Sequence, residues 1–210
     1  SDLTAKRPMP RAMSDYTDKA AVVTGASSGI GRAVAIALAA RGARVLLAAR
    51  RQADLEAVRD EIVAAGGQAE AVVCDVTDDA AVANLAAAAR DHLGRVDLLV
   101  NNAGREMPLP LAAARRADAT AVLEVNVTSL AAVTRAMLPL LPAGSAVVNV
   151  ASASALRASP GASLYAASKG AVVSLTRSLA VELAGRPVRV NAVAPGMVRT
   201  AMTERILAKL

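Results

Sequence analysis

The sequence contains no phenylalanine and no tryptophan, and Tyr16 and Tyr165 are its two tyrosines. A chain with so few aromatic rings offers no stacking platform for bases, which argues against single-stranded nucleic acid as a ligand. The 24 lysines and arginines outnumber the 18 acidic residues and give a net charge of +6. The arginines are scattered over many segments and form no single basic stripe. We therefore expect no nucleic-acid partner.

Cysteine and histidine each occur once, as Cys74 and His92. A single cysteine excludes an internal disulfide and is typical of a reducing compartment, so we expect a cytoplasmic protein. One cysteine and one histidine also argue against a metal site built on these ligands. No apolar run reaches the roughly 18 residues that span a bilayer. The polar, proline-containing N-terminus does not look like a signal peptide, so we expect no membrane partner.

Hydrophobic residues make up 54% of the 210 residues and charged residues 20%, which is typical of a globular chain. Without phenylalanine and tryptophan, the core must consist of alanine, valine and leucine. Residues 1–17 are polar and irregular and contain Pro8 and Pro10, so we expect a flexible extension there. We expect residues 18–210 to form one domain, in keeping with the usual size of a domain.

Short apolar runs alternate along the chain with helical patterns of about ten to twenty residues. The expected strands share a nearly continuous apolar character and cover residues 20–24, 44–48, 71–74, 96–100, 146–150 and 188–193. The expected helices lie between or after them, at residues 29–41, 53–65, 78–92, 117–140, 164–184 and 200–209. Such alternation predicts βαβ units and a parallel sheet covered on both faces, because buried parallel strands are apolar throughout. The expected fold is therefore α/β and doubly wound, with ligands bound at the carboxyl ends of the strands.

A glycine-rich turn follows the first expected strand and runs directly into a helix. Its residues are Thr24, Gly25, Ala26, Ser27, Ser28, Gly29, Ile30 and Gly31. Gly25 allows a tight turn, Gly29 lets the backbone approach a pyrophosphate, and Gly31 lets the helix pack close to the strand. The helix N-terminus adds unpaired N–H groups and a favourable dipole. Glycine turns are common, but a strand before and a helix after this one predict a dinucleotide site.

The second expected strand ends at Arg50 and Arg51. Dehydrogenases that prefer NAD usually carry an acidic residue at this strand end, where it binds the ribose 2′-hydroxyl. Here the position is basic, and an arginine is a bidentate donor suited to a 2′-phosphate. Arg50 therefore favours NADP(H) over NAD(H), and the alternative is that it only begins a solvated helix.

Tyr165 and Lys169 are spaced by four residues in an alanine-rich stretch that reads as helix, so their side chains lie on one face. An ammonium beside a phenol lowers the pKa of the phenol, which would make Tyr165 a general acid/base near neutral pH. The alternative is a solvated helix face with a chance pair. The pattern alone does not decide between the two.

Taken in order, these motifs resemble the short-chain dehydrogenase/reductase family from about Lys19 to Thr200. The glycine turn matches its TGxxxGxG loop, Tyr165 to Lys169 its YxxxK pair, and Ser152 lies 13 residues before the tyrosine. The remaining matches are Asn101–Gly104 to NNAG, Asn126 to the asparagine of the long helix, Asp75 after the third strand, and Pro195–Thr200 to PGxVxT. The chain resembles 3-oxoacyl-carrier-protein reductases and related NADPH-dependent keto reductases most closely.

The resemblance implies a Rossmann fold with strand order 3-2-1-4-5-6, and it implies a role for each matched residue. Ser152 and Tyr165 would bind the substrate carbonyl, with Tyr165 passing the proton. Lys169 would lower the pKa of the tyrosine and bind the nicotinamide ribose, and Asn126 would hold a water that relays protons. Other positions would contact the cofactor, and they are Gly25, Ser27, Ser28, Gly29, Ile30, Gly31, Arg50, Asp75, Val76, Asn102, Ala103, Gly104, Pro195, Gly196, Val198 and Thr200.

The implied function is an NADP(H)-dependent oxidoreductase that acts on a carbonyl or secondary alcohol, with an acyl-carrier-linked substrate among the options. The alternative is a dinucleotide-binding sensor or scaffold with little catalysis. Candidate substrate-pocket positions are Arg105, Glu106, Met107, Ser154, Leu156 and Met197. The resemblance also implies a homodimer or homotetramer through helices 117–140 and 164–184.

The family usually continues about 40 residues beyond the point where this sequence stops, through a covering helical region and a seventh strand. We therefore expect a domain that lacks that strand. The strand at 188–193 would become a sheet edge, and an apolar edge invites association. We expect this edge to be covered by a partner chain, by the 1–17 extension or by residues outside this sequence.

Overall fold

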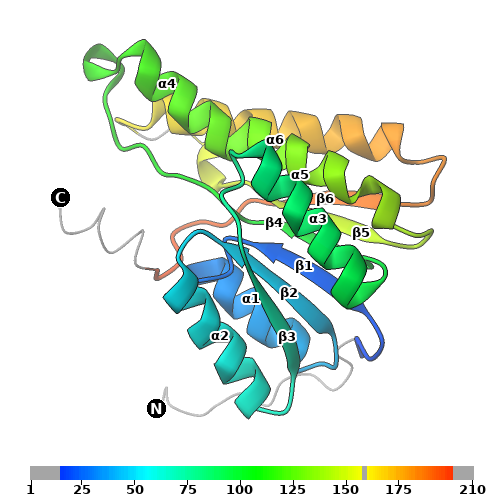
Figure 1. Cartoon of the computed structure of the whole chain (residues 1–210). Coiled ribbons are helices and arrows are strands. Elements are labelled where there is room, and N and C mark those ends of the chain that lie inside the picture. Colours follow the sequence, from blue (N-terminus) through cyan, green and yellow to red (C-terminus); the bar gives the residue numbers. More distant parts are fainter. Residues whose placement is uncertain (1–14, 158–159, 201–210) are drawn as a thin grey trace, which may run out of the picture.

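The computed structural model describes residues 15–157 and 160–200, which form a parallel six-stranded sheet with helices on both faces (Figure 1). The strand order is β3-β2-β1-β4-β5-β6, which confirms the expected doubly wound fold. Every strand pair is parallel, and all strands therefore end at one edge. The strands are β1 (Ala20–Thr24), β2 (Arg44–Ala49), β3 (Gln68–Val73), β4 (Leu98–Asn101), β5 (Ala146–Val150) and β6 (Arg189–Val193).

Helices α1 (Gly29–Ala39) and α2 (Gln52–Ala64) pack on one face of the sheet, against β1, β2 and β3. The other face is covered by α3 (Asp79–Leu93), α5 (Ser129–Met137) and α6 (Ser163–Glu182). Helix α4 (Arg116–Leu123) precedes α5 and packs against α6. This arrangement leaves the carboxyl ends of β1, β2, β4 and β5 as the rim on which a site can form.

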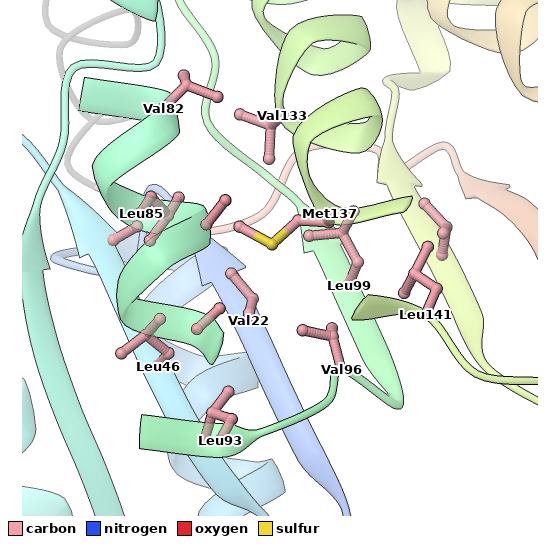
Figure 2. Close-up of a cluster of buried hydrophobic side chains, with 14 of the residues drawn as sticks. Val22, Leu46, Val82, Leu85, Leu93, Val96, Leu99, Val133, Met137 and Leu141 are labelled. Carbon is pink, nitrogen blue, oxygen red and sulfur yellow. The ribbon is translucent and has the colours of Figure 1, made fainter. Parts of the chain in front are cut away.

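Two hydrophobic cores lie on the two faces of the sheet, because alternate strand residues point to opposite sides. In β1, Val22 faces the core formed with α3 and α5, whereas Ala21 and Val23 face the core formed with α1 and α2. Figure 2 shows the first core, in which Met137 of α5 lies near Leu99 of β4. The largest fully buried side chains are leucine, valine and methionine, as expected for a chain without phenylalanine and tryptophan.

The expected boundaries are accurate to a few residues, and two of the strand differences have clear causes. Strand β3 begins at Gln68 instead of residue 71, because an edge strand alternates exposed and half-buried residues and its start is therefore not apolar. Strand β4 begins at Leu98 instead of residue 96, because the N–H of Val96 donates to the oxygen of Leu140 at 2.8 Å and so leaves the ladder. The expected terminal helix, 200–209, lies almost entirely outside the described residues.

The helix expected over 117–140 is continuous but not uniform. Between α4 and α5 the backbone makes one π turn, Glu124–Thr128, and after α5 it tightens into a 3-10 turn, Leu138–Leu140. The hydroxyl of Ser129 donates to the oxygen of Val125 at 2.7 Å within the wide turn. Single π turns inside α-helices are frequent at functional sites, and this one carries Asn126.

The same run, Arg116–Leu140, is the one helix among the described residues with the length and mean hydropathy, 1.3, to cross a membrane. Glu124 and Arg135 interrupt this helix, so it contains no unbroken apolar run of the length that the sequence argument considered. Core helices of globular domains meet the same criterion, and 39% of this window is buried. Within the run, α5 packs against α3 and β4.

Residues 15–17, which the sequence analysis assigns to a flexible extension, are attached to the domain. The N–H of Tyr16 donates to the oxygen of Arg41 at 2.9 Å, and the tyrosine ring packs on the core beneath α1. At the opposite end, β6 forms the sheet edge among the described residues, and Val193 is 52% exposed. The described chain therefore does not itself cover this edge, and its covering stays a prediction.

Candidate functional site

The glycine turn after β1 has the close packing that the sequence predicts. Gly25 has a φ of 65°, and a Cβ there would lie 2.8 Å from Nδ2 of Asn102. A Cβ on Gly31 would lie 2.3 Å from the oxygen of Gly25, so no side chain fits where α1 crosses the turn. Asn102 in turn donates through Nδ2 to the oxygens of Thr24 and Gly25, at 3.0 and 3.2 Å. These contacts fix the backbone of the turn at the end of β1.

The N-terminus of α1 is left open to a ligand. Ser28 occupies the N-cap position but makes no side-chain capping hydrogen bond, and the first turn of α1 contains no acidic residue. In α3, by contrast, Asp78 caps the helix by accepting from the N–H groups of Ala80 and Ala81. An uncapped helix start with no acidic side chain in its first turn is suited to bind an anion.

A cavity of about 430 Å³ extends along the carboxyl ends of the strands, from this turn toward α6. Almost all expected site residues line it, including Tyr165, Lys169, Ser152 and Asp75. The exceptions are Gly31, which is buried behind the turn, and Asn126, which is 1% exposed behind the wall. The loop after β6 closes one side of the cavity with Pro195, Gly196, Val198 and Thr200. An elongated cavity with this lining fits a dinucleotide.

Basic and acidic side chains meet at the end of the cavity nearest β2 and β3. Arg50 is exposed and lies 3.9 Å from Oδ2 of Asp75, and Arg51 pairs with Asp54 at 2.9 Å. Asp75 accepts from the N–H and the hydroxyl of Thr77, and the backbone hydrogen bond contributes most to lowering the pKa of this carboxyl. The site therefore offers an ionised carboxylate and two guanidinium groups side by side.

Tyr165 and Ser152 both line the opposite end of the cavity, and Ser152 acts to lower the pKa of the phenol. The pKa of Tyr165 is nevertheless raised, because burial outweighs the lowering effect of Ser152 and the charge of Glu106 acts in the same direction as burial. The expected lowering of the tyrosine pKa toward neutrality is therefore wrong.

The position of Lys169 shows why its charge does not lower the pKa of Tyr165. Its ammonium donates to the backbone oxygen of Val150 at 2.8 Å and lies 6.0 Å from the centre of the Tyr165 ring. The side chain is 5% exposed, and burial lowers the pKa of Lys169 to about 8. Lys169 therefore stays mainly protonated at pH 7, but its ammonium is directed at a backbone carbonyl and not at the phenol.

Asn126 lies behind the cavity wall, where it joins three segments. Its Oδ1 accepts from the N–H of Arg105 at 2.7 Å, and its Nδ2 donates to the oxygen of Arg105 and to the hydroxyl of Ser168, both at 2.9 Å. Both amide hydrogens are thus used inside the protein. The expected water relay therefore cannot use these hydrogens without breaking an internal hydrogen bond.

The expected substrate side is open on the described chain. Leu156 is 69% exposed and Met197 is 73% exposed, whereas Met107 is buried. Arg105 lines the cavity, and Glu106 is near enough to Tyr165 to raise its pKa. Of the candidate positions, Arg105 and Glu106 are thus placed near the cavity, and Leu156 and Met197 form no closed pocket on the described chain.

Several lining residues carry no sequence signal of a site. They are Ala49, Cys74, Val125, Val150 and Ala151, and they contribute walls rather than chemistry. Cys74 is buried, and desolvation raises the pKa of its thiol to about 11, which keeps it protonated. Their position one or two residues before an expected site residue is the only signal that could have identified them. Across residues 15–157 and 160–200, no three histidine, cysteine or acidic side chains are grouped as metal ligands would be.

Comparison with known proteins agrees with this geometry. The family model described as short chain dehydrogenase matches residues 19–210. A 3-oxoacyl-[acyl-carrier-protein] reductase of Synechocystis is 40% identical over 200 residues, which cover 94% of this chain and 81% of the relative. A 1-deoxy-11-beta-hydroxypentalenate dehydrogenase of Streptomyces avermitilis is 43% identical, over 90% of this chain and 72% of the relative.

A solved structure of a short chain dehydrogenase from Burkholderia cenocepacia in complex with NADP superposes with a TM-score of 0.86 and is 38% identical. The superposition covers 90% of this chain and 78% of that one. A family model that matches most of the chain, and relatives at this level of identity, place the sequence among oxidoreductases with a dinucleotide-binding fold. The chain belongs to the short-chain dehydrogenase/reductase family.

Proposed function

We propose that this chain is an NADP(H)-dependent oxidoreductase that interconverts a carbonyl and a secondary alcohol, with Tyr165 as general acid/base. The observation that carries the proposal is that a single cavity joins an uncapped helix N-terminus to the Tyr165, Ser152 and Lys169 side chains. The nicotinamide would supply or accept the hydride when the cofactor is bound. The rest of the chemistry belongs to the side chains of this chain.

The cofactor would be held by groups along the whole cavity. The glycine turn and the start of α1 would bind the pyrophosphate, and Asp75 and Val76 would contact the adenine. Arg50, with Arg51 beside it, would bind a 2′-phosphate, because a guanidinium is a bidentate donor to phosphate. The NADP bound to the Burkholderia relative is in keeping with this preference.

Tyr165 and Ser152 would bind the carbonyl oxygen of the substrate as negative charge develops on it. Because the pKa of Tyr165 is raised, its phenol carries a proton at neutral pH, which is the form needed to protonate the alkoxide in reduction. Oxidation of an alcohol would need the phenolate, and burial disfavours that form.

Lys169 and Asn126 would act beside the reacting atoms. The Lys169 ammonium, released from the Val150 oxygen, would bind the ribose hydroxyls of the nicotinamide half and would then stand closer to the phenol. Asn126 would keep the wall in place through the backbone of Arg105, and a relayed water would have to use its second acceptor site or its backbone oxygen.

The substrate would be a neutral ketone or a β-ketoacyl group, and an acyl-carrier-linked form is in keeping with the Synechocystis relative. The open surface near Leu156 and Met197 would admit a long acyl chain. The test is a panel of ketones and β-ketoacyl thioesters with NADPH, followed by the absorbance of the reduced cofactor. Oxidation of NADPH by at least one of them supports the proposal, and no turnover with any of them would refute it.

A sensor or scaffold that binds the dinucleotide without useful catalysis is the second candidate. It is favoured by the exposure of Leu156 and Met197, which leaves the substrate side open on the described chain. Tight NADPH binding combined with no turnover across the panel would support this reading instead.

We further propose a cytoplasmic homodimer or homotetramer that assembles through α4, α5 and α6. Helix α6 carries Val181, which is 78% exposed, and α4 carries Leu123, which is 42% exposed, so apolar surface is available for a two-fold contact. A monomeric mass at micromolar concentration would contradict the assembly.

A further inference from the structure

Three segments of the site meet at one buried hydroxyl group, that of Ser168. The loop after β4 carries Arg105, the π turn carries Asn126, and α6 carries Ser168 between Tyr165 and Lys169. Ser168 is 0% exposed and Asn126 is 1% exposed, so water does not satisfy these side chains.

The hydrogen bonds at this point form one chain, and each hydrogen in it is donated to one acceptor. Nδ2 of Asn126 donates to the oxygen of Arg105 and to Oγ of Ser168, both at 2.9 Å. The Ser168 hydroxyl, which has one hydrogen to give, donates to the backbone oxygen of Tyr165 at 2.7 Å. The hydroxyl therefore accepts from the π turn and donates to the residue that carries the phenol.

Gly104 shows how closely the same segments approach one another. A Cβ at this position would lie 3.3 Å from Oδ1 of Asn126 and 3.3 Å from Nζ of Lys169. Small movements of α6 against the π turn would therefore displace the lysine as well as the tyrosine. In a site packed this tightly, a displacement of about 1 Å is enough to cost much of the rate.

Building on the proposed function, we propose that Ser168 is a positioning residue, whose hydroxyl fixes the turn of α6 that carries Tyr165 and Lys169 against Asn126 and the Arg105 loop. It touches neither substrate nor cofactor, because it lies behind the cavity wall and does not line the cavity. Without the hydroxyl, one amide hydrogen of Asn126 loses its buried partner, and the link between the π turn and α6 is lost.

The chain contains a matched control on the same helix. Thr176 is also buried, donates to the oxygen of Val172 at 2.7 Å, and accepts from Nδ2 of Asn149 at 2.9 Å. It reproduces the pattern of Ser168, a hydroxyl between a helix carbonyl and an asparagine amide, about two turns farther along α6. Thr176→Val removes the hydroxyl at almost constant volume and leaves the site residues in place.

The experiment compares Ser168→Ala, Ser168→Thr and Thr176→Val with the parent, using a ketone that the parent reduces. Ser168→Ala is expected to lower kcat about 10-fold while the NADPH dissociation constant stays near the parent value. Ser168→Thr keeps the hydroxyl and is expected to retain more of kcat than Ser168→Ala. Thr176→Val is expected to lower the melting temperature like Ser168→Ala and to leave kcat near the parent value. Equal losses of kcat in Ser168→Ala and Thr176→Val, or no loss in Ser168→Ala, would overturn the proposal.

A second measurement does not depend on turnover. With only Tyr16 and Tyr165 in the chain, ring-labelled tyrosine gives two NMR signals, which Tyr16→Phe assigns. Ser168→Ala is expected to shift the Tyr165 signal and not that of Tyr16, whereas Thr176→Val is expected to shift neither. A parent protein that reduces no ketone would refute the proposed function, and these signals then decide the role of Ser168. An unmoved Tyr165 signal in Ser168→Ala would overturn the role proposed for Ser168.

Discussion

The ammonium of Lys169 donates a hydrogen bond to the backbone oxygen of Val150 at 2.8 Å. The lysine is thereby tied to the end of β5, while its side chain is almost fully buried. Burial lowers the pKa of Lys169 to about 8, which means that its charged form is disfavoured in the folded protein. The buried charge of Lys169 therefore lowers the stability of the fold at neutral pH, and a polar ligand that binds the ammonium would stabilise its charged form.

The stability of the parent should therefore depend on pH through Lys169. Between its folded pKa of about 8 and its ordinary value near 10.5, the unfolded chain binds the proton better, so this contribution to stability rises with pH. The loss of stability that comes from burying the charged Lys169 is fully present well below pH 8. Replacing the lysine, as in Lys169→Met, should be more favourable to stability at pH 7 than at pH 9.5, by about 2 kcal/mol. Urea unfolding of both proteins at the two pH values measures the difference, and a variant effect that is equal at both would contradict it.

The preference for NADPH should depend on Arg50. NADPH is expected to bind more tightly than NADH by about 1.5–3 kcal/mol, the range for a hydrogen bond to a charged group. Arg50→Ala should remove most of this gap and leave NADH affinity nearly unchanged, because only the 2′-phosphate distinguishes the two cofactors. Calorimetric titration of both cofactors is the measurement, and Arg59→Ala is the control, since Arg59 pairs with Asp60 away from the cavity. Equal affinities of the parent for NADPH and NADH would refute this role.

The glycine turn should tolerate no side chain at Gly31. A Cβ would lie 2.3 Å from the oxygen of Gly25 and 2.4 Å from Nδ2 of Asn102, so Gly31→Ala must displace the turn. We expect a loss of about 1–3 kcal/mol of stability together with weaker dinucleotide binding. Gly170→Ala is the control, because no atom lies within 4 Å of its added Cβ and alanine favours a helix. If Gly31→Ala binds NADPH like the parent, the turn does not cradle the cofactor.

The edge strand β6 should be protected in solution by a further chain segment. On the described residues, Arg189, Asn191, Ala192 and Val193 are all exposed, and such an edge invites pairing. Hydrogen exchange at two protein concentrations tests this on the Arg189–Val193 amides that point away from β5, which excludes Arg189, whose N–H donates to the oxygen of Ser145. Slow exchange is expected, and protection that increases with concentration would identify a second copy as the cover. Fast exchange in a stable, active protein would show that the edge is bare and that the expectation is wrong.

The fold was readable from the sequence because the apolar runs of β1, β2 and β5 are buried parallel strands with few polar interruptions. Strand β3 was placed less well, because an edge strand keeps polar residues such as Gln68 and Glu70. The π turn was not predicted at all. No residue type marks it, since it arises where the buried side chain of Asn126 must reach both Arg105 and Ser168.

The candidate site was likewise predictable where short sequence motifs determine it, and it was not predictable where packing determines it. The resemblance to the family motifs identified most of the lining residues, and the fold brings them together because parallel strands end at one edge. The pKa of Tyr165 could not be predicted from its spacing to Lys169. It is set by burial of the phenol, by the neighbouring Ser152 and by the charge of Glu106, and all three depend on packing.

The central claim, that Tyr165 is the proton donor of a carbonyl reductase, is tested most directly by Tyr165→Phe on a ketone that the parent reduces with NADPH. The change removes one hydroxyl and keeps the ring that lines the cavity. General acid catalysis contributes about 10²–10⁴-fold to a rate, so turnover should fall by a factor of at least about 10² while NADPH binding persists. A Tyr165→Phe protein that reduces the ketone at a rate near that of the parent would contradict the claim.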